Sequence, residues 1–382
     1  MDTLLSRSTQ HISGAVSCIR IPMAAEPELQ YYHHGRFKVA GGVLPDAVTA
    51  YQTYGNPSNP CIVFPTCYGA QLRLGSQLYL VGEGKVSALV TRSTPEYMKA
   101  LDPRKYFVVT FALFCNGESS SPSNTPAPYN GPYFPAVSYE DNIRAQYAVL
   151  TKKLGVTRVL CAVGFSMGGQ QAYHWAVVFP DFVEKIVVIC SSARTSPHNK
   201  CFLEGPKSAL VAGRDFNDGH YTSSPHFAIR AFARAYCAWA YGQTWFRRHL
   251  YLGDGLYPTL DAFIREGWEG RFIANWDAND MLALLTTWQN GDVSQVRDEG
   301  DLPRCLSSIK AKALIMPCKT DLYFCPEDSV VEISHLNSAE LVVIDSVWGT
   351  QLEEALTLRM LLSLRQRFGS FSRKERKYFD CL

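Results

Sequence analysis

Short apolar runs alternate along this chain with segments that have helical periodicity. Residues 61–64, 106–111 and 185–190 are continuous apolar runs of strand length. Between the second and third of these, residues 139–154 carry Ile143, Tyr147 and Leu150 at helical spacing. Strands and helices that alternate in this way predict a mostly parallel, doubly wound sheet with helices on both faces, which is an α/β fold.

Two other parts of the chain depart from this alternation. Residues 36–54, near its start, predict edge strands around a Gly41-Gly42 turn. Residues 196–304, in its second half, contain aromatic-rich helical segments such as 226–236 and no strand-like run. We therefore expect a helical lid inserted into the sheet domain. The predicted parts are an irregular leader 1–28, a first core part 29–195, the lid insertion 196–304, a second core part 305–350 and a divergent C-terminal helix and tail 351–382.

A candidate nucleophile lies at the end of the apolar run 158–163. The run leads into Gly164-Phe165-Ser166-Met167-Gly168-Gly169, and a helix-like stretch begins at Gln170. A strand, a G-x-S-x-G turn and a helix hold a serine on a strained bend with its hydroxyl above the sheet. We interpret Ser166 as an acyl-accepting nucleophile; the alternative is a structural turn serine.

Two main-chain amides are candidates for an oxyanion hole. Met167 follows the candidate nucleophile, and its N–H points with the positive end of the new helix at the place where an acyl oxyanion would form. The second donor is expected in the loop 66–70, after the strand that ends at Phe64-Pro65, and we assign it to the N–H of Tyr68.

The candidate acid is Asp321, in the loop that follows the strand-like run 312–317. The order Ser, Asp, His is typical of this kind of site, and the alternative is a loop or helix-capping aspartate. The base is expected after the next predicted strand, 341–345, but Gly349-Thr350 stands where a Gly-His pair would lie. A threonine hydroxyl has no accessible pKa near neutrality, so the triad is incomplete.

Other histidines are weaker candidates for the base. His335 is expected on an outer helix that points away from the Ser166 turn, and His174 is expected to be buried behind the site. His198, His220 and His226 fall in the predicted lid, which could reach over the pocket, although their spacing gives no support for that role.

Composition agrees with an enzyme of this size. The 382 residues are 47% hydrophobic and 19% charged, which allows a large core, and 37 Lys and Arg against 35 Asp and Glu leave a net charge of +2. No nucleic-acid partner is implied. The 12 cysteines show no zinc-type spacing and indicate buried thiols in a reducing compartment, hence a cytoplasmic protein without a metal. Neither a secretory signal nor an apolar run of about 20 residues is present, so no membrane span is expected.

An ordered series of motifs gives the chain a family resemblance. It resembles the homoserine O-acetyltransferase branch of the α/β-hydrolases, especially the hydrolase-like relatives of fungi and bacteria, between about residues 31 and 349. The matching landmarks are Leu101-Asp102-Pro103, Asn116-Gly117-Glu118-Ser119-Ser120-Ser121, Asp141-Asn142-Ile143-Arg144, the elbow with Gln170-Gln171-Ala172-Tyr173, Gly219-His220-Tyr221, Asp277-Ala278-Asn279-Asp280 and Thr320-Asp321-Leu322-Tyr323-Phe324.

The resemblance implies an α/β-hydrolase fold and an acyl-serine that passes its acyl group to a hydroxyl or to water. It makes Lys207 and Tyr221 candidates for the substrate pocket. Lys207 stands where the acetyltransferases carry an arginine that grips the amino-acid carboxylate, and lysine cannot form that bidentate fork. The resemblance also allows acyl-CoA as a co-substrate, no other cofactor, a small-molecule substrate and a homodimer.

Two functional classes follow. The first is a serine-dependent acyl hydrolase or acyltransferase acting on a small ester, thioester or metabolite hydroxyl, with secondary metabolism as a setting suggested by the resemblance alone. The second is a catalytically impaired relative that binds or assists a partner without turnover, because the triad histidine is absent. The abrupt break after Gly349 is consistent with a true loss of the base or with an altered gene model or splice form.

Overall fold

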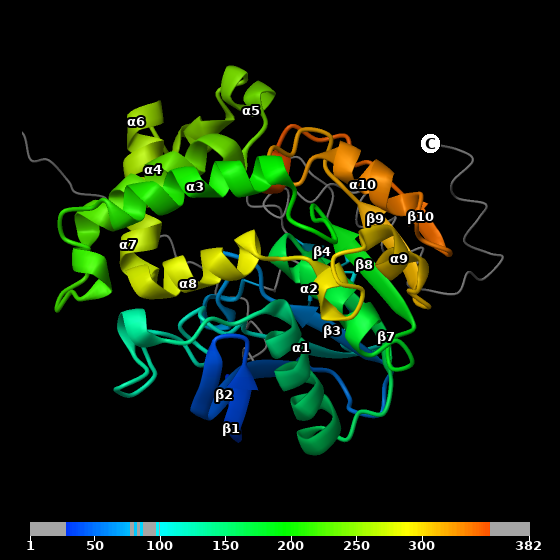
Figure 1. Cartoon of the computed structure of the whole chain (residues 1–382). Coiled ribbons are helices and arrows are strands. Elements are labelled where there is room, and N and C mark those ends of the chain that lie inside the picture. Colours follow the sequence, from blue (N-terminus) through cyan, green and yellow to red (C-terminus); the bar gives the residue numbers. More distant parts are fainter. Residues whose placement is uncertain (1–27, 77–79, 82–84, 87–96, 99, 352–382) are drawn as a thin grey trace, which may run out of the picture.

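The computed structural model describes residues 28–76, 80–81, 85–86, 97–98 and 100–351. The predicted leader up to residue 27 and the predicted tail from residue 352 lie outside the described residues. Figure 1 shows one sheet with helices on both sides and a second group of helices stacked beside it.

The sheet has eight strands in the order β1-β2-β6-β3-β7-β8-β9-β10. The pairings β1–β2 and β2–β6 are antiparallel, and every pairing from β6 to β10 is parallel. A separate two-stranded sheet pairs β4 with β5. The bounds are β1 Gln30–Val39, β2 Gly42–Tyr54, β3 Cys61–Pro65, β4 Lys85–Val86, β5 Tyr97–Met98, β6 Phe107–Phe111, β7 Val159–Phe165, β8 Lys185–Ile189, β9 Lys312–Met316 and β10 Ala339–Leu341.

Both faces of the parallel part of the sheet are buried. On one face, α1 (Tyr139–Ala148) and α2 (Met167–Val178) cover the strands with side chains such as Ile143 and Trp175. On the other face, Leu80 and Leu101 belong to a second apolar cluster. The fully buried parallel strands explain the continuous apolar runs in the sequence, and the α/β-hydrolase type of fold is confirmed.

Seven described α-helices lie between β8 and β9, and the first six of them, α3 to α8, gather on one side of the sheet, at the upper left of Figure 1. We call this part the helical insertion. Its bounds are α3 Pro197–Val211, α4 His226–Ala240, α5 Gln243–Arg247, α6 Leu260–Ala262, α7 Arg271–Asn275 and α8 Ala278–Gln289. The core of the insertion is aromatic, and it is continuous with the residues around the sheet's carboxyl edge.

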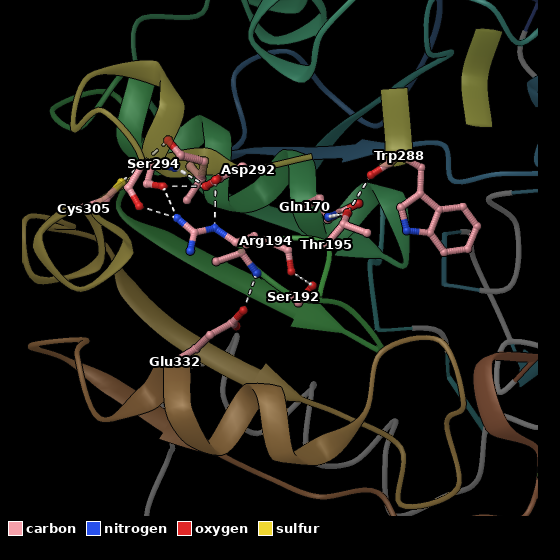
Figure 2. A network of polar contacts seen from close by, with 12 residues as sticks. Gln170, Ser192, Arg194, Thr195, Trp288, Asp292, Ser294, Cys305 and Glu332 are labelled. Atoms are coloured by element: carbon pink, nitrogen blue, oxygen red, sulfur yellow. Dashed lines mark hydrogen bonds and ion pairs between the residues drawn. The ribbon is translucent and has the colours of Figure 1, made fainter. Parts of the chain in front are cut away.

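The neck of the helical insertion is held by a polar network (Figure 2). Arg194 donates to Asp292, Ser294 and the carbonyl of Gly300, so the chain leaving the sheet is tied to the chain returning to it. Thr195 lies between Gln170 and the carbonyl of Trp288 and bonds to both. These contacts fix the insertion to the start of α2.

Two more helices complete the fold, α9 Leu302–Ser307 and α10 Pro326–Ile333. Two expected elements differ in their ends. The predicted helix 139–154 is α-helical to Ala148 and continues as a π-helical segment, Val149–Lys153. The predicted strand 341–345 pairs as a strand only at Ala339–Leu341, and Ile344 adds an isolated bridge to Cys318. The sheet edge therefore ends several residues before Thr350.

Candidate active site

Ser166 sits on a sharply strained bend between β7 and α2. Its backbone has φ 52° and ψ −122°, a conformation that a non-glycine residue rarely adopts. The bend is held because the Ser166 N–H donates to Ile189 O at 2.9 Å. A Cβ on Gly164 would lie 1.9 Å from Gly168 O, so only glycine lets α2 pack back on its own strand.

The amides of Met167 and Tyr68 come from neighbouring segments. Gln171, on α2, donates to Thr66 O at 3.0 Å, and a Cβ on Gly168 would lie 3.0 Å from Pro65 O. The first turn of α2 therefore packs against the loop that carries Tyr68. Within the described part of the chain, neither amide donates a hydrogen bond. Both N–H groups thus remain available to an oxyanion.

The side chain of Tyr68 packs into the helical insertion. Its hydroxyl donates to Met281 O at 3.2 Å, and its ring lies parallel to that of Trp276, 6.2 Å away with an interplanar angle of 4°. Burial raises the pKa of this phenol well above its ordinary value, so the side chain stays neutral. Tyr68 thus joins the loop after β3 to the insertion through its side chain.

Asp321 lies in the loop after β9 and is almost fully buried, with 3% of its surface exposed. Its Oδ1 accepts from the amides of Tyr323 and Phe324 at 2.8 and 3.0 Å. Burial raises the pKa of this carboxyl to about 6, and the hydrogen bonds oppose the rise. Among the described residues Asp321 forms no ion pair, so its charge is balanced by hydrogen bonds alone.

Thr350 occupies the position next to the acid. Its hydroxyl donates to Asp321 Oδ2 at 2.7 Å, and 4% of the residue is exposed. Thr320 fixes the segment that precedes it, because the Thr320 hydroxyl donates to Ser346 O and accepts from the Gly349 N–H. The residue at the position expected for histidine therefore makes the contact to the acid that an imidazole N–H makes in a triad.

Residues 189 and 190 connect the serine to the acid. Ile189 accepts the bond from the Ser166 amide, and the next side chain, the Cys190 thiol, bonds to Asp321 and opposes the rise of its pKa. Cys190 itself has a positive φ of 45°. Sequence reasoning treated Cys190 as a buried thiol in a strand, because neither its backbone angle nor a contact across 131 positions leaves a local signal.

The five histidines considered as alternative bases make no polar contact with Ser166 or Asp321 among the described residues. His174 is buried on α2, where its Nδ1 bonds to Gln170 O at 2.7 Å, and burial lowers its pKa to about 4. His335 lies just beyond the end of α10 and is half-buried, whereas His198, His220 and His226 are exposed. None of these five forms a hydrogen bond or ion pair with Ser166 or Asp321.

The two predicted pocket residues lie in the helical insertion. Lys207 Nζ is 3.3 Å from both Glu204 Oε1 and Gln289 Oε1, so it connects α3 with the end of α8. The hydroxyl of Tyr221 donates to Asp277 Oδ1 at 2.8 Å and accepts from the Asn279 amide at 2.9 Å. No hydrogen bond or ion pair joins either residue to Ser166 or Asp321 in the described part of the chain.

Within the residues that the structure describes, no three His, Cys, Asp or Glu side chains are grouped to hold a metal ion. The ten cysteines in these ranges are free thiols. No helix described in the structure has the length and apolar character needed to cross a membrane.

Known proteins resemble this chain in their amino-acid sequence. The profile of the alpha/beta hydrolase fold family matches residues 81–208. An ethyl acetate hydrolase of Pseudomonas veronii is 33% identical over 317 residues, which are 81% of this chain and 85% of that protein. A homoserine O-succinyltransferase of Acinetobacter baumannii is 32% identical over 250 residues, 60% of this chain and 64% of that enzyme.

Among solved structures, that of an acetylester hydrolase from Corynebacterium glutamicum matches with a TM-score of 0.81 and 27% identity. It covers 90% of this chain, and 96% of that chain is matched. The relatives found by sequence and by structure are thus esterases and homoserine acyltransferases, as the motif series predicted. The strained serine turn, the sheet topology and these relatives together show that the chain belongs to the α/β-hydrolase superfamily, in its esterase and homoserine acyltransferase branch.

Proposed function

We propose that this protein hydrolyses or transfers small acyl groups through an acyl-enzyme on Ser166. The observation that carries the proposal is the strained Ser166 turn, beside which the amides of Met167 and Tyr68 have no acceptor among the described residues. Backbone strain of this kind persists where function requires it. Two free amides next to a bent serine suit the charge that develops on an acyl oxygen during attack.

A base other than histidine must then accept the serine proton. In our proposal Ser166 Oγ bonds to the acyl carbon while its proton passes through a water to Thr350 Oγ1. The proton of Thr350 moves in turn to Asp321 Oδ2, along the 2.7 Å hydrogen bond. When the tetrahedral intermediate collapses, the proton returns by the same route to the leaving alcohol or thiol. Thr350 is neutral before and after the step, and the carboxylate is the base.

The basicity of Asp321 supports this route. Burial raises its pKa to about 6, close to the value of about 6.5 for an ordinary imidazole. Such a carboxylate is still ionised at neutral pH and holds a proton better than an exposed aspartate does. We expect a slow reaction nonetheless, because a relay through a water and a hydroxyl is less well ordered than a direct bond to imidazole.

The substrate class follows from the relatives. The ethyl acetate hydrolase and the acetylester hydrolase act on short acyl esters by name, so we propose a short-chain ester or thioester, including acyl-CoA, as donor. Water or a metabolite hydroxyl is the acceptor, and secondary metabolism is the proposed setting by analogy. The free buried cysteines support a cytoplasmic location.

The proposal is tested with p-nitrophenyl acetate and a fluorophosphonate probe, using the wild type beside Ser166→Ala. We expect slow turnover and covalent labelling of the wild type, and loss of both in Ser166→Ala. A fold check by circular dichroism confirms that the variant is intact. Turnover that survives in a folded Ser166→Ala protein would disprove the assignment of the nucleophile.

A second candidate function is ligand binding without turnover. It is favoured by one observation, the threonine hydroxyl in the position where a triad carries imidazole. In that case the wild type binds a short-chain ester but neither hydrolyses it nor reacts with the probe. The two candidates therefore differ in the labelling experiment.

A further inference from the structure

Three arginines on the helical insertion line a hollow of about 420 Å³, which we call the arginine hollow. Arg230 and Arg234 are one helical turn apart on α4, and Arg265 comes from the π-helical segment Phe263–Gly270. Glu269, Gly270 and Ile273 complete the lining. Neither Ser166 nor Asp321 belongs to this hollow, so it is separate from the candidate active site.

The three guanidinium groups are about half exposed, with side-chain exposures of 50%, 52% and 57% for Arg230, Arg234 and Arg265. A guanidinium carries five N–H donors, so those that face solvent remain open to a ligand. Among the described residues, the ion-pair partners of Glu269, whose side chain is 8% exposed, are the two α4 arginines, and Arg265 lies 3.4 Å from the exposed Asp261. Three positive charges thus face two negative ones, and a local charge of +1 remains.

Ile273 also lines a second hollow, of about 400 Å³. We call it the hydroxyl hollow. Its other lining residues are mostly polar: Tyr221, Thr222, Ser223, Ser224, Ala274, Asn275, Trp276 and Asp277. A ligand held at the arginines therefore has a hydroxyl-bearing surface near it, which also includes the carboxylate of Asp277.

We propose that the two hollows form one binding site for a polar ligand with an oxyanion group. The phosphate or carboxylate lies against Arg230, Arg234 and Arg265, because a planar guanidinium offers paired donors that match both groups. The neutral hydroxyl-bearing part extends past Ile273 into the hydroxyl hollow. Each hollow falls within the range of known small-molecule sites, about 300–1,000 Å³.

The site would also border the candidate active site through one side chain. Trp276 lines the hydroxyl hollow, and its ring is also parallel to the ring of Tyr68. Tyr68 carries one of the two amides beside Ser166. The inference itself is independent of catalysis, since it rests on the charges and shape of the helical insertion.

The test measures binding by isothermal titration calorimetry with the full chain, at low and at physiological salt. The probes are inorganic pyrophosphate, citrate and glucose 6-phosphate, which separate phosphate from carboxylate recognition and add a hydroxyl-bearing part. We expect saturable binding of at least one probe at millimolar concentration or below, weaker at the higher salt because exposed charges are screened. In Arg230→Gln/Arg234→Gln the affinity should fall by about tenfold or more.

The matched control is Arg247→Gln/Arg248→Gln, which removes the same charge from α5, outside both hollows. It should bind like the wild type. A further variant, Ser223→Ala/Ser224→Ala, should weaken glucose 6-phosphate but not pyrophosphate. Absence of saturable binding for all three probes overturns the proposal, and so does an equal loss of affinity in the control. Melting temperatures establish that each variant is folded.

Discussion

Replacing Thr350 with histidine should raise the rate of ester hydrolysis. The hydroxyl of Thr350 is already 2.7 Å from Asp321 Oδ2, so the side chain at this position reaches the acid without any change of the backbone. An imidazole there would donate to Asp321 and accept directly from Ser166, in place of a relay through water.

The size of the gain follows from the role of a positioned base. General base catalysis contributes about 10²- to 10⁴-fold, equivalent to about 2.7–5.4 kcal/mol of transition-state stabilisation. The larger side chain enters a site where only 4% of Thr350 is exposed, and such overpacking costs about 1–3 kcal/mol of stability. We therefore expect a less stable but much faster enzyme.

The assay compares kcat/KM for p-nitrophenyl acetate and the burst of p-nitrophenol across variants. Thr350→Val keeps the side-chain shape and removes the relay hydroxyl, so its activity should fall below that of the wild type. Thr350→His/Ser166→Ala should be inactive. A folded Thr350→His protein with unchanged kcat/KM and no burst would refute the idea that the missing imidazole limits this site.

Three further predictions concern the effect of pH on stability, glycine substitutions at the Ser166 turn and on α3, and the Arg194 network at the neck of the helical insertion. Burial raises the pKa of Glu332 to about 8 from an ordinary 4.5, so unfolding releases its proton between these values. The free energy of unfolding should then fall by up to about 1.4 kcal/mol for each unit that the pH rises between these two values, as measured by urea titrations. Glu332→Gln should make this dependence on pH weaker. Gly164→Ala should unfold the protein or abolish activity, whereas Gly205→Ala, where an added Cβ meets nothing within 4 Å, should stabilise by about 0.5–1 kcal/mol in thermal melts. Arg194→Ala should cost about 1–3 kcal/mol in the same melts, since three acceptors lose their donor, and an unchanged melting temperature would contradict the role of the neck.

The fold could be predicted because its signals are local. Continuous apolar runs mark the buried parallel strands, and the glycines around Ser166 mark a turn that no larger residue could form. The edge strand 341–345 was overestimated because the chain after Leu341 keeps only an isolated bridge between Ile344 and Cys318, and Val343 is exposed. Local sequence pattern cannot separate such an apolar run from a regular strand.

The polar interior was less predictable. The sequence identified Thr350 as a departure from the expected triad, but not its bond to Asp321, which spans 29 positions and depends on where two loops end. Glu332 accepts from Tyr173 and from the Ala193 amide, and nothing in its helical segment distinguishes it from a surface glutamate. Contacts of this kind arise from tertiary structure and leave no periodic signal.

The packing of Gly349 has a consequence for substrate access. Gly349 has φ 58°, and an added Cβ would lie 3.0 Å from Ala240 O at the end of α4 and 2.9 Å from the Gly242 N just before α5. A Cβ on Gly242 would in turn meet the Thr320 hydroxyl at 2.6 Å. One corner of the helical insertion is thus fastened to the same short segment that presents Thr350. A movement of the insertion away from that segment would separate Thr350 from Asp321, so in the proposed mechanism reactants enter and leave along a different edge.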